Sequence, residues 1–217
     1  MKIKQFQFND ISVNTYIVWD SQTLAAVIID PGCYYPQEEQ TLKQFVEDNK
    51  LNINHILNTH LHFDHIFGNN FAEETFGVAA KAHSADMPWL LQIGRRLASF
   101  GIQYNKSVNP IKPENFLQEG DTVSFGRHTF NILHIPGHSP GSLVYYCKEE
   151  NILFCGDVLF KGSLGRYDFA DSDGAALVQG IRQKLFTLPD NTVVYSGHGP
   201  STTTIGIEKV YNIIHSL

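Results

Sequence analysis

Cysteine is scarce in this sequence, and long apolar runs are absent. The three cysteines are odd in number and share no zinc-finger spacing, so no disulfide framework is expected. No stretch approaches the roughly 18 apolar residues that cross a membrane, and the first ten residues lack the apolar core of a signal peptide. We therefore expect a cytoplasmic protein with no membrane partner.

An excess of positive charge is also absent. The 217 residues carry a net charge of −6 and no basic run, which argues against electrostatic binding of nucleic acid. A hydrophobic content of 42% and a charged content of 18% are ordinary for a globular chain with a sizeable core. We predict one domain over residues 1–217 that acts on a small molecule, and the sequence leaves its oligomeric state open.

What the sequence does contain is a recurring arrangement: a short apolar run followed by a polar residue that can bind a metal. The runs AAVIID, INHILNTH, FNILHIPGH, NILFCGD and TVVYSGH end at Asp30, His60, His138, Asp157 and His198. Each run is typical of a short buried strand. Strands of one sheet end at a common edge, so these distant side chains are expected at one rim.

The remaining segments predict helices and a few further strands. Helical spacing is found from Pro36 onward, over 66–77, over 172–190 and over 202–217. In the last segment an apolar stripe is expected to pack into the core; it consists of Ile207, Val210, Tyr211 and Ile214. Residues 3–30 are typical of successive antiparallel strands. Together these predict an α/β (α+β) protein with two sheets face to face and helices outside.

The densest group of candidate ligands lies in LNTHLHFDHIFGN, residues 57–69, which holds His60, His62, Asp64 and His65. Zinc and similar ions bind imidazole nitrogen and carboxylate oxygen. His60 and His62 are two positions apart, so on an extended segment they face the same side. Asp64 and His65 follow where the chain bends into a helix, and they can point to a second ion.

Four side chains cannot fill two coordination shells, and the later strand ends offer completions. His138, Asp157 and His198 are the natural candidates, and the two oxygens of Asp157 can bridge two ions. We expect two divalent metal ions, with zinc first and iron or manganese as alternatives. Asp30 and Asp168 are candidates to accept hydrogen bonds from ligand imidazoles. Asp30 is equally well a turn residue, and Asp168 is equally well an ion-pair partner of Arg166.

Residues 84–116 separate the ligand cluster from the later strands. Their length and their mixture of aromatics, proline, glycine and arginine favour a lid or pocket wall, with a surface excursion as the alternative. The candidate lining residues are Trp89, Phe100 and Tyr104, with Arg95 or Arg96 to attract an anionic substrate.

The segment THLHFDH resembles the His-x-His-x-Asp-His signature of the metallo-β-lactamase superfamily. PGHSPGS, GDVLFKGSLGR and SGHGPSTTTIG are similar to its later motifs in the same order, so the resemblance covers nearly the whole chain. It implies a four-layer αββα sandwich with two metals at one edge. The implied ligands are His60, His62 and His138 for the first ion, Asp64, His65 and His198 for the second, and Asp157 as the bridge. Asp64 and Asp157 are the expected catalytic residues.

Within the superfamily, GDVLFKGSLGRYDF is most similar to the glyoxalase II and persulfide dioxygenase branch. His62 stands where flavodiiron-type proteins carry Glu, and Asp157 is a bridging residue that the true β-lactamases lack. Only 19 residues follow His198, so the C-terminal helical domain with which glyoxalase II holds glutathione is not expected. Compact, single-domain glyoxalase II-like hydrolases are the nearest resemblance.

This resemblance implies a dinuclear hydrolase that cleaves a thioester such as S-lactoylglutathione by means of a metal-bridging hydroxide. Arg166 and Tyr167 are the candidates to contact substrate. One alternative is an oxidoreductase of the persulfide dioxygenase type, which uses a single iron held by two histidines and an aspartate. A non-catalytic metal-binding module is the other.

Overall fold

Two β-sheets form the centre of the protein in this computed structural model, which describes residues 1–99, 101, 108–199 and 202–217. The first sheet has the order β1-β2-β3-β4-β5, and the second has the order β13-β12-β9-β8-β7-β6. The first contains β1 (Lys2–Phe8), β2 (Val13–Trp19), β3 (Ala25–Ile29), β4 (Asn52–Leu57) and β5 (Ala80–Lys81). The second contains β6 (Thr122–Phe125), β7 (His128–His134), β8 (Leu143–Cys147), β9 (Ile152–Gly156), β12 (Val193–Ser196) and β13 (Thr203–Thr204). A short hairpin, β10 (Leu159–Phe160) and β11 (Ser163–Leu164), stands apart.

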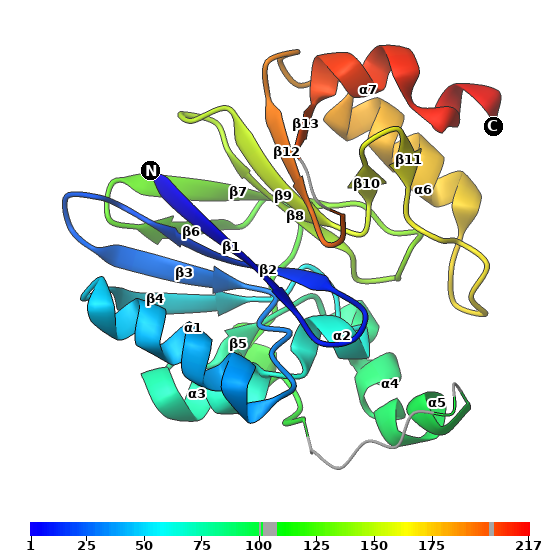
Figure 1. Cartoon of the computed structure of the whole chain (residues 1–217). Coiled ribbons are helices and arrows are strands. Elements are labelled where there is room, and N and C mark those ends of the chain that lie inside the picture. The colour runs from blue at the N-terminus through cyan, green and yellow to red at the C-terminus, as the bar shows by residue number, and fades with distance from the viewer. Residues whose placement is uncertain (100, 102–107, 200–201) are drawn as a thin grey trace.

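Helices cover the outer face of each sheet (Figure 1). The first sheet carries α1 (Pro36–Asp48) and α3 (Asn69–Phe76); the second carries α6 (Gly174–Gly180), its π-helical continuation η3 (Ile181–Leu185) and α7 (Ile205–Tyr211). Shorter elements are α2 (Phe63–Ile66), η1 (Ser84–Asp86), α4 (Met87–Leu90), α5 (Ile93–Ser99), η2 (Pro113–Asn115) and η4 (Ile213–Ser216). The predicted αββα sandwich is confirmed. None of the helices in the described ranges has the length and apolar character needed to cross a bilayer.

Three separate apolar cores hold the four layers together. Along β2, Ile17 packs toward the helices while its neighbour Val18 packs toward the second sheet. Along β9, Phe154 faces the first sheet and Cys155 faces the outer helices. All four side chains are buried. Since strand side chains alternate between faces, a strand that is apolar on both faces must be covered on both, as these are.

The predicted strands agree with the observed ones. The N-terminal segment forms the antiparallel pairs β1–β2 and β2–β3, and the five apolar runs correspond to β3, β4, β7, β9 and β12. Of the helix predicted over 66–77, residues Asn69–Phe76 form α3, which ends at Gly77 as predicted, while Ile66 is the last residue of the separate helix α2. The chain turns between them at Gly68, where a Cβ atom would lie 2.3 Å from Cys33 Sγ and 2.8 Å from the Pro31 carbonyl oxygen.

The predicted apolar stripe of the C-terminal tail is wrong in three of its four members. Ile207, Val210 and Tyr211 are exposed, and only Ile214 is buried. Helix α7 instead turns Glu208 inward, where its carboxylate accepts hydrogen bonds from Gly162 N, Thr203 Oγ1 and Asn212 Nδ2. Three donors make burial of this acidic side chain tolerable, and that rotates the apolar positions beside it into solvent.

The two sheets are joined by hydrogen bonds at the edge where the candidate ligands lie. Tyr145 of β8 donates to the Asn58 carbonyl at 2.5 Å, and the Leu143 amide donates to the Thr59 carbonyl at 2.7 Å. Asn14 of β2 donates to the Ser196 carbonyl at 3.0 Å. These bonds fix the ends of β4 and β12 relative to each other, so the residues that follow those strands have defined positions.

The corrected tail leads to a stability prediction. Ile214→Ala should lower the free energy of unfolding by about 2–5 kcal/mol, because Ile214 is fully buried among the outer-helix core residues. Val210→Ala is the matched control: its side chain is 63% exposed, and the loss should stay within about 0.5 kcal/mol. Urea unfolding measures both, and equal losses would contradict the observed orientation of α7 and η4 in the C-terminal tail.

Candidate metal centre

All seven predicted ligands converge at the sheet edge. His60 follows the end of β4, and His62 leads into α2, whose first turn holds Asp64 and His65. The other three come from the second sheet: His138 from the β7–β8 loop, Asp157 directly after β9, and His198 shortly after β12. Asp157 and His198 are brought together because β9 and β12 are parallel neighbours.

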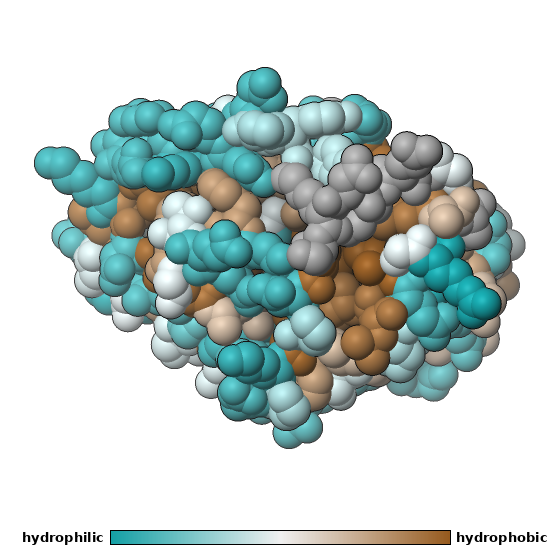
Figure 2. Space-filling model, turned by 90° about the horizontal axis from the view of Figure 1, so that it is seen from below, coloured by the Kyte–Doolittle hydropathy of each residue, from teal (hydrophilic) through white to brown (hydrophobic). Residues whose placement is uncertain are grey.

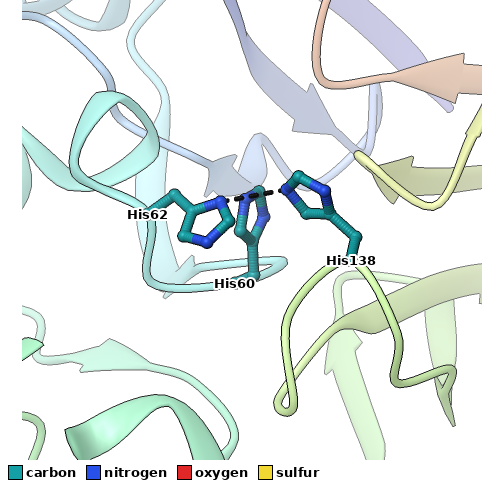
Figure 3. A group of neighbouring side chains, drawn as sticks. All are labelled: His60, His62 and His138. Atoms are coloured by element: carbon teal, nitrogen blue, oxygen red, sulfur yellow. Dashed lines mark hydrogen bonds between the residues drawn. The ribbon is translucent and has the colours of Figure 1, made fainter. Parts of the chain in front are cut away.

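The first group contains His60, His62 and His138, whose ligand nitrogens all lie within 4.8 Å of one another. Figure 3 shows the three rings turned toward a common point. His138 Nε2 lies 2.9 Å from His62 Nδ1, a distance at which two ring nitrogens can share one proton. A metal ion would accept a lone pair from each of them instead.

The second group contains Asp64, His65 and His198. His198 Nε2 lies 3.1 Å from Asp64 Oδ2, and His65 Nε2 lies 3.6 Å from the same oxygen. His65 is fully buried and Asp64 is 7% exposed. Two imidazoles and one carboxylate form a donor set typical of a divalent transition metal.

Asp157 lies between the two groups. Its Oδ1 is 3.5 Å from His65 Nε2 on one side, and its Oδ2 is 3.6 Å from His138 Nε2 on the other. The carboxylate has room only because residue 197 is glycine: a Cβ at Gly197 would lie 2.2 Å from Asp157 Oδ1. The arrangement places one carboxylate where it can serve both groups.

Unpaired buried atoms indicate that the two groups fit metal ions. His60 Nε2, His65 Nε2 and Asp157 Oδ1 are buried and have no hydrogen-bond partner among the described residues. A polar atom buried without a partner costs free energy. Each of these atoms is a metal-ligating atom type aimed at one of the groups, so a bound ion would remove that cost.

Electrostatics make the two groups unlike each other. Burial, together with the nearby His138, lowers the pKa of His62 to about 3, and burial lowers the pKa of His60 well below its usual value. Burial opposes the charged form of His65 too, but Asp64, Asp157 and Asp30 outweigh it and raise the pKa of His65 well above the usual value. The first group thus offers neutral imidazoles, whereas metal entry at the second must displace protons.

Asp30 orients two of the ligand imidazoles. It is buried, and it accepts hydrogen bonds from His65 Nδ1 at 2.9 Å and from Thr59 N and Oγ1 at 2.7 and 2.6 Å. Thr59 Oγ1 in turn lies 3.1 Å from His60 Nδ1. Occupying the Nδ1 atoms in this way leaves Nε2 of both rings for a metal. The prediction that Asp30 accepts a hydrogen bond from a ligand imidazole is confirmed.

Asp168 does not orient an imidazole. It forms a two-bond ion pair with the Arg166 guanidinium, at 2.9 and 2.8 Å, on the surface. The prediction that Asp168 holds a ligand ring is wrong, and the ion-pair alternative is confirmed. His138 Nδ1 instead donates to the main-chain carbonyl of Arg166 at 2.8 Å. A backbone acceptor leaves no side-chain signal, so the sequence gives no way to identify it.

Two further bracing residues, Thr59 and Asp86, were not identified from the sequence. Thr59 adjoins His60, and that adjacency was the available signal. Asp86 is buried and hydrogen-bonds to Leu61, Ser139 and Gly141, partners that lie 25 to 55 positions away in the chain. No local pattern marks such a residue.

A cavity of about 510 Å³ opens above the two groups. Most of its lining is aromatic, aliphatic or metal-ligating: Ile11, His62, Phe63, Asp64, Trp89, Arg96, His138, Asp157, Phe160, Leu164, Arg166, Phe169 and His198. The lower face of the molecule shows an apolar hollow (Figure 2). The Trp89 ring lies 5.0 Å from the His62 ring, so the predicted pocket wall is confirmed for Trp89 and Arg96.

The other candidates for the wall and for substrate contact fall elsewhere. Arg95 is exposed and does not line the cavity, and Phe100 and Tyr104 lie outside the described residues. Arg166 lines the cavity. The Tyr167 ring lies against Gly174 and lines a separate depression beside α6, so its contact with substrate stays a prediction.

Comparison with known proteins agrees with this geometry. The Metallo-beta-lactamase superfamily matches residues 9–198. Hydroxyacylglutathione hydrolase GloC of Haemophilus influenzae is 35% identical over 214 residues, which cover 98% of this chain and 97% of that protein. The crystal structure of BLEG-1 B3 metallo-β-lactamase has a TM-score of 0.82 at 36% identity, covering 97% of this chain and 98% of that one. TTHA1623, solved in a di-iron-bound form, also has a TM-score of 0.82, at 34% identity over 96% of this chain and 98% of that one.

The family match spans most of the chain, and the similarity to GloC extends over nearly its full length. The chain therefore belongs to the metallo-β-lactamase superfamily, with the histidine-rich, two-metal site of a metallohydrolase.

Proposed function

We propose that this chain hydrolyses a thioester of the hydroxyacylglutathione class, with S-lactoylglutathione as the reference substrate, and that it uses two zinc ions. The observation that carries the proposal is the position of Asp157 between two histidine-rich groups on the floor of a cavity. Similarity to GloC over nearly the full chain supports the substrate class. The His/Asp donor set also suits iron or manganese, and metal analysis of the isolated protein distinguishes the three.

Two bound divalent ions would lower the pKa of a water held between them and polarise a carbonyl oxygen. His60, His62 and His138 would hold one ion, Asp64, His65 and His198 would hold the other, and Asp157 would contact both. Asp64 and Asp157 also supply the negative charge of the centre. A thiolate leaves without prior protonation because thiols are comparatively acidic, so the reaction requires no strong protein acid.

The cavity walls suit a substrate with an apolar portion and an anionic one. Phe63, Trp89 and Phe169 surround the ligand cluster with aromatic surface, which limits the access of bulk water. Arg166 stacks on Phe169 with its guanidinium carbon 4.6 Å from the ring centre. Arg96 stacks on Trp89 at 5.3 Å. Among the described residues, these two guanidinium groups are the arginine and lysine side chains of the lining, and we propose that Arg166 attracts a substrate carboxylate.

The alternative is a single-iron oxidoreductase of the persulfide dioxygenase type. Such a centre needs only two histidines and one aspartate, whereas here Asp64, His65 and His198 form a second group within 4.8 Å. The presence of this complete second set of ligand-type side chains favours the hydrolase.

Substitution of the shared ligand tests the centre. Asp157→Ala should reduce the metal content from close to two ions per chain to one or fewer, and should lower thioesterase activity by more than about 100-fold. Asp48→Ala is the control, since Asp48 is an exposed carboxylate at the end of α1 whose described hydrogen bond is to Gln44. Full activity of the Asp157 variant without metal would end the proposal.

A substrate panel separates the candidate reactions. The metal-loaded chain should hydrolyse S-lactoylglutathione at least ten times faster, in kcat/KM, than a lactone, a phosphodiester or a β-lactam. Oxygen consumption with glutathione persulfide should stay at background. Oxygen uptake without thioester cleavage would select the dioxygenase, and preferential cleavage of the β-lactam would replace the proposed substrate class.

Arg166 provides a test of substrate charge. Arg166→Ala should raise KM for an anionic thioester about 2- to 5-fold, the size expected for an exposed ion pair, and leave KM for an uncharged thioester unchanged. The backbone carbonyl that holds His138 remains in this variant, so kcat should hold. Arg95→Ala, on the exposed side of α5, is the control. An equal change for both substrates would contradict the charge argument.

A further inference from the structure

We propose that Asp86 is a positioning residue of the metal centre: it holds the segment that carries His60 and His62 at a fixed separation from the loop that carries His138. All three ligands of the first group depend on those two segments. This inference rests on the proposed metal centre, and it adds a determinant of metal affinity that touches no metal itself.

The contacts of Asp86 span both segments. Its Oδ2 accepts a hydrogen bond from the Leu61 amide at 3.0 Å and one from Ser139 Oγ at 2.9 Å. Its Oδ1 accepts from the Gly141 amide at 2.6 Å. Leu61 stands between His60 and His62, and Ser139 directly follows His138. One carboxylate therefore links the chain on either side of the first metal group.

Only a short carboxylate satisfies these donors. Asp86 is 2% exposed, so water cannot replace a lost partner. An ionised carboxylate accepts at both oxygens, whereas an amide would direct an NH2 group at either Leu61 N–H or the Gly141 amide. The contact with the loop is also close: a Cβ on Gly141 would lie 2.6 Å from Asp86 Cγ. The Asp86 side chain thus fixes the distance between the segment that carries His60 and His62 and the loop that carries His138.

Asp86 also links the metal group to the cavity wall. It directly precedes α4, which carries Trp89, and the Trp89 ring lies 5.0 Å from the His62 ring. His62 Nδ1 and His138 Nε2, one from each braced segment, are 2.9 Å apart. A change in the brace would therefore alter the distance between two ligand atoms of the same ion.

Glu208 shows what a purely structural buried carboxylate looks like in this chain. It is equally buried and also accepts three hydrogen bonds, from Gly162 N, Thr203 Oγ1 and Asn212 Nδ2. These partners tie α7 to the β10–β11 turn and include no metal ligand or neighbour of one. Glu208→Gln is therefore the matched control for Asp86→Asn.

The experiment compares these two isosteric variants in the full chain. Competition with a chromophoric zinc chelator gives the affinity of each of the two zinc equivalents, and urea unfolding of the metal-free protein gives stability. Asp86→Asn should weaken one equivalent by about 10- to 100-fold and change the other by less than about 3-fold. Glu208→Gln should lower the urea midpoint to a similar degree and leave both affinities within about 2-fold.

The alternatives give different results. If Asp86→Asn lowers the urea midpoint but keeps both affinities within twofold, Asp86 is structural only and the inference fails. If both carboxylate variants weaken both equivalents alike, the effect is general destabilisation and the inference also fails. A wild-type chain that binds no zinc, iron or manganese would instead overturn the proposed function.

A milder variant keeps the inference testable if Asp86→Asn does not fold. Ser139→Ala removes one of the three donors and leaves both backbone bonds to Asp86 in place. It should weaken the same single equivalent several-fold. Unchanged affinity in this variant, together with an Asp86→Asn chain that cannot be refolded even with zinc present, would assign Asp86 to folding alone.

Discussion

Seven titratable side chains lie close together at one edge of the two sheets, and most of them are buried. The rest of the structure offsets the free-energy cost of bringing them together. Buried imidazoles and carboxylates are costly unless they are paired, and several of the ligand atoms have no hydrogen-bond partner within the part of the chain that the structure describes. The αββα sandwich provides a rigid support, because apolar cores on both faces of each sheet fix the strand ends. Each ligand lies on a loop that follows a strand end, so its position is fixed by the sheet. Hydrogen bonds between the sheets, such as that from Tyr145 to the Asn58 carbonyl, hold the two sheet edges together.

The two groups of ligands differ in how the surrounding protein shifts the pKa values of their histidines. Around the first group the protein keeps histidines neutral by burial, so their lone pairs are available from the outset. Around the second, the carboxylates of Asp64, Asp157 and Asp30 raise the pKa of His65 against the effect of burial, so metal binding there competes with a proton. Two divalent ions would carry four positive charges against two carboxylates, Asp64 and Asp157. The loaded centre would keep an excess of positive charge, as an electrophilic site for a carbonyl oxygen requires.

The features that could be predicted from the sequence are those encoded locally. His60, His62, Asp64 and His65 lie within six positions, and the rule that ligands follow strand ends predicts His138, Asp157 and His198 near them. Short apolar runs similarly predict the strands that precede these ligands. What failed depends on partners distant in the chain. Glu208 is buried because three remote donors meet it, so the apolar stripe of the tail could not reveal which face turns inward.

The hydrogen bond from His138 to the Arg166 carbonyl has a wider consequence. The side chain of Arg166 lines the cavity, and its backbone carbonyl orients the His138 ring. The same residue therefore contacts both the substrate space and a metal ligand. A bound molecule that displaces Arg166 would also change the affinity of the first group for its metal ion. Thermodynamic reciprocity requires that the ion change the affinity for that molecule by the same factor. With metal bound, occupancy of the cavity and retention of the ion would be linked equilibria.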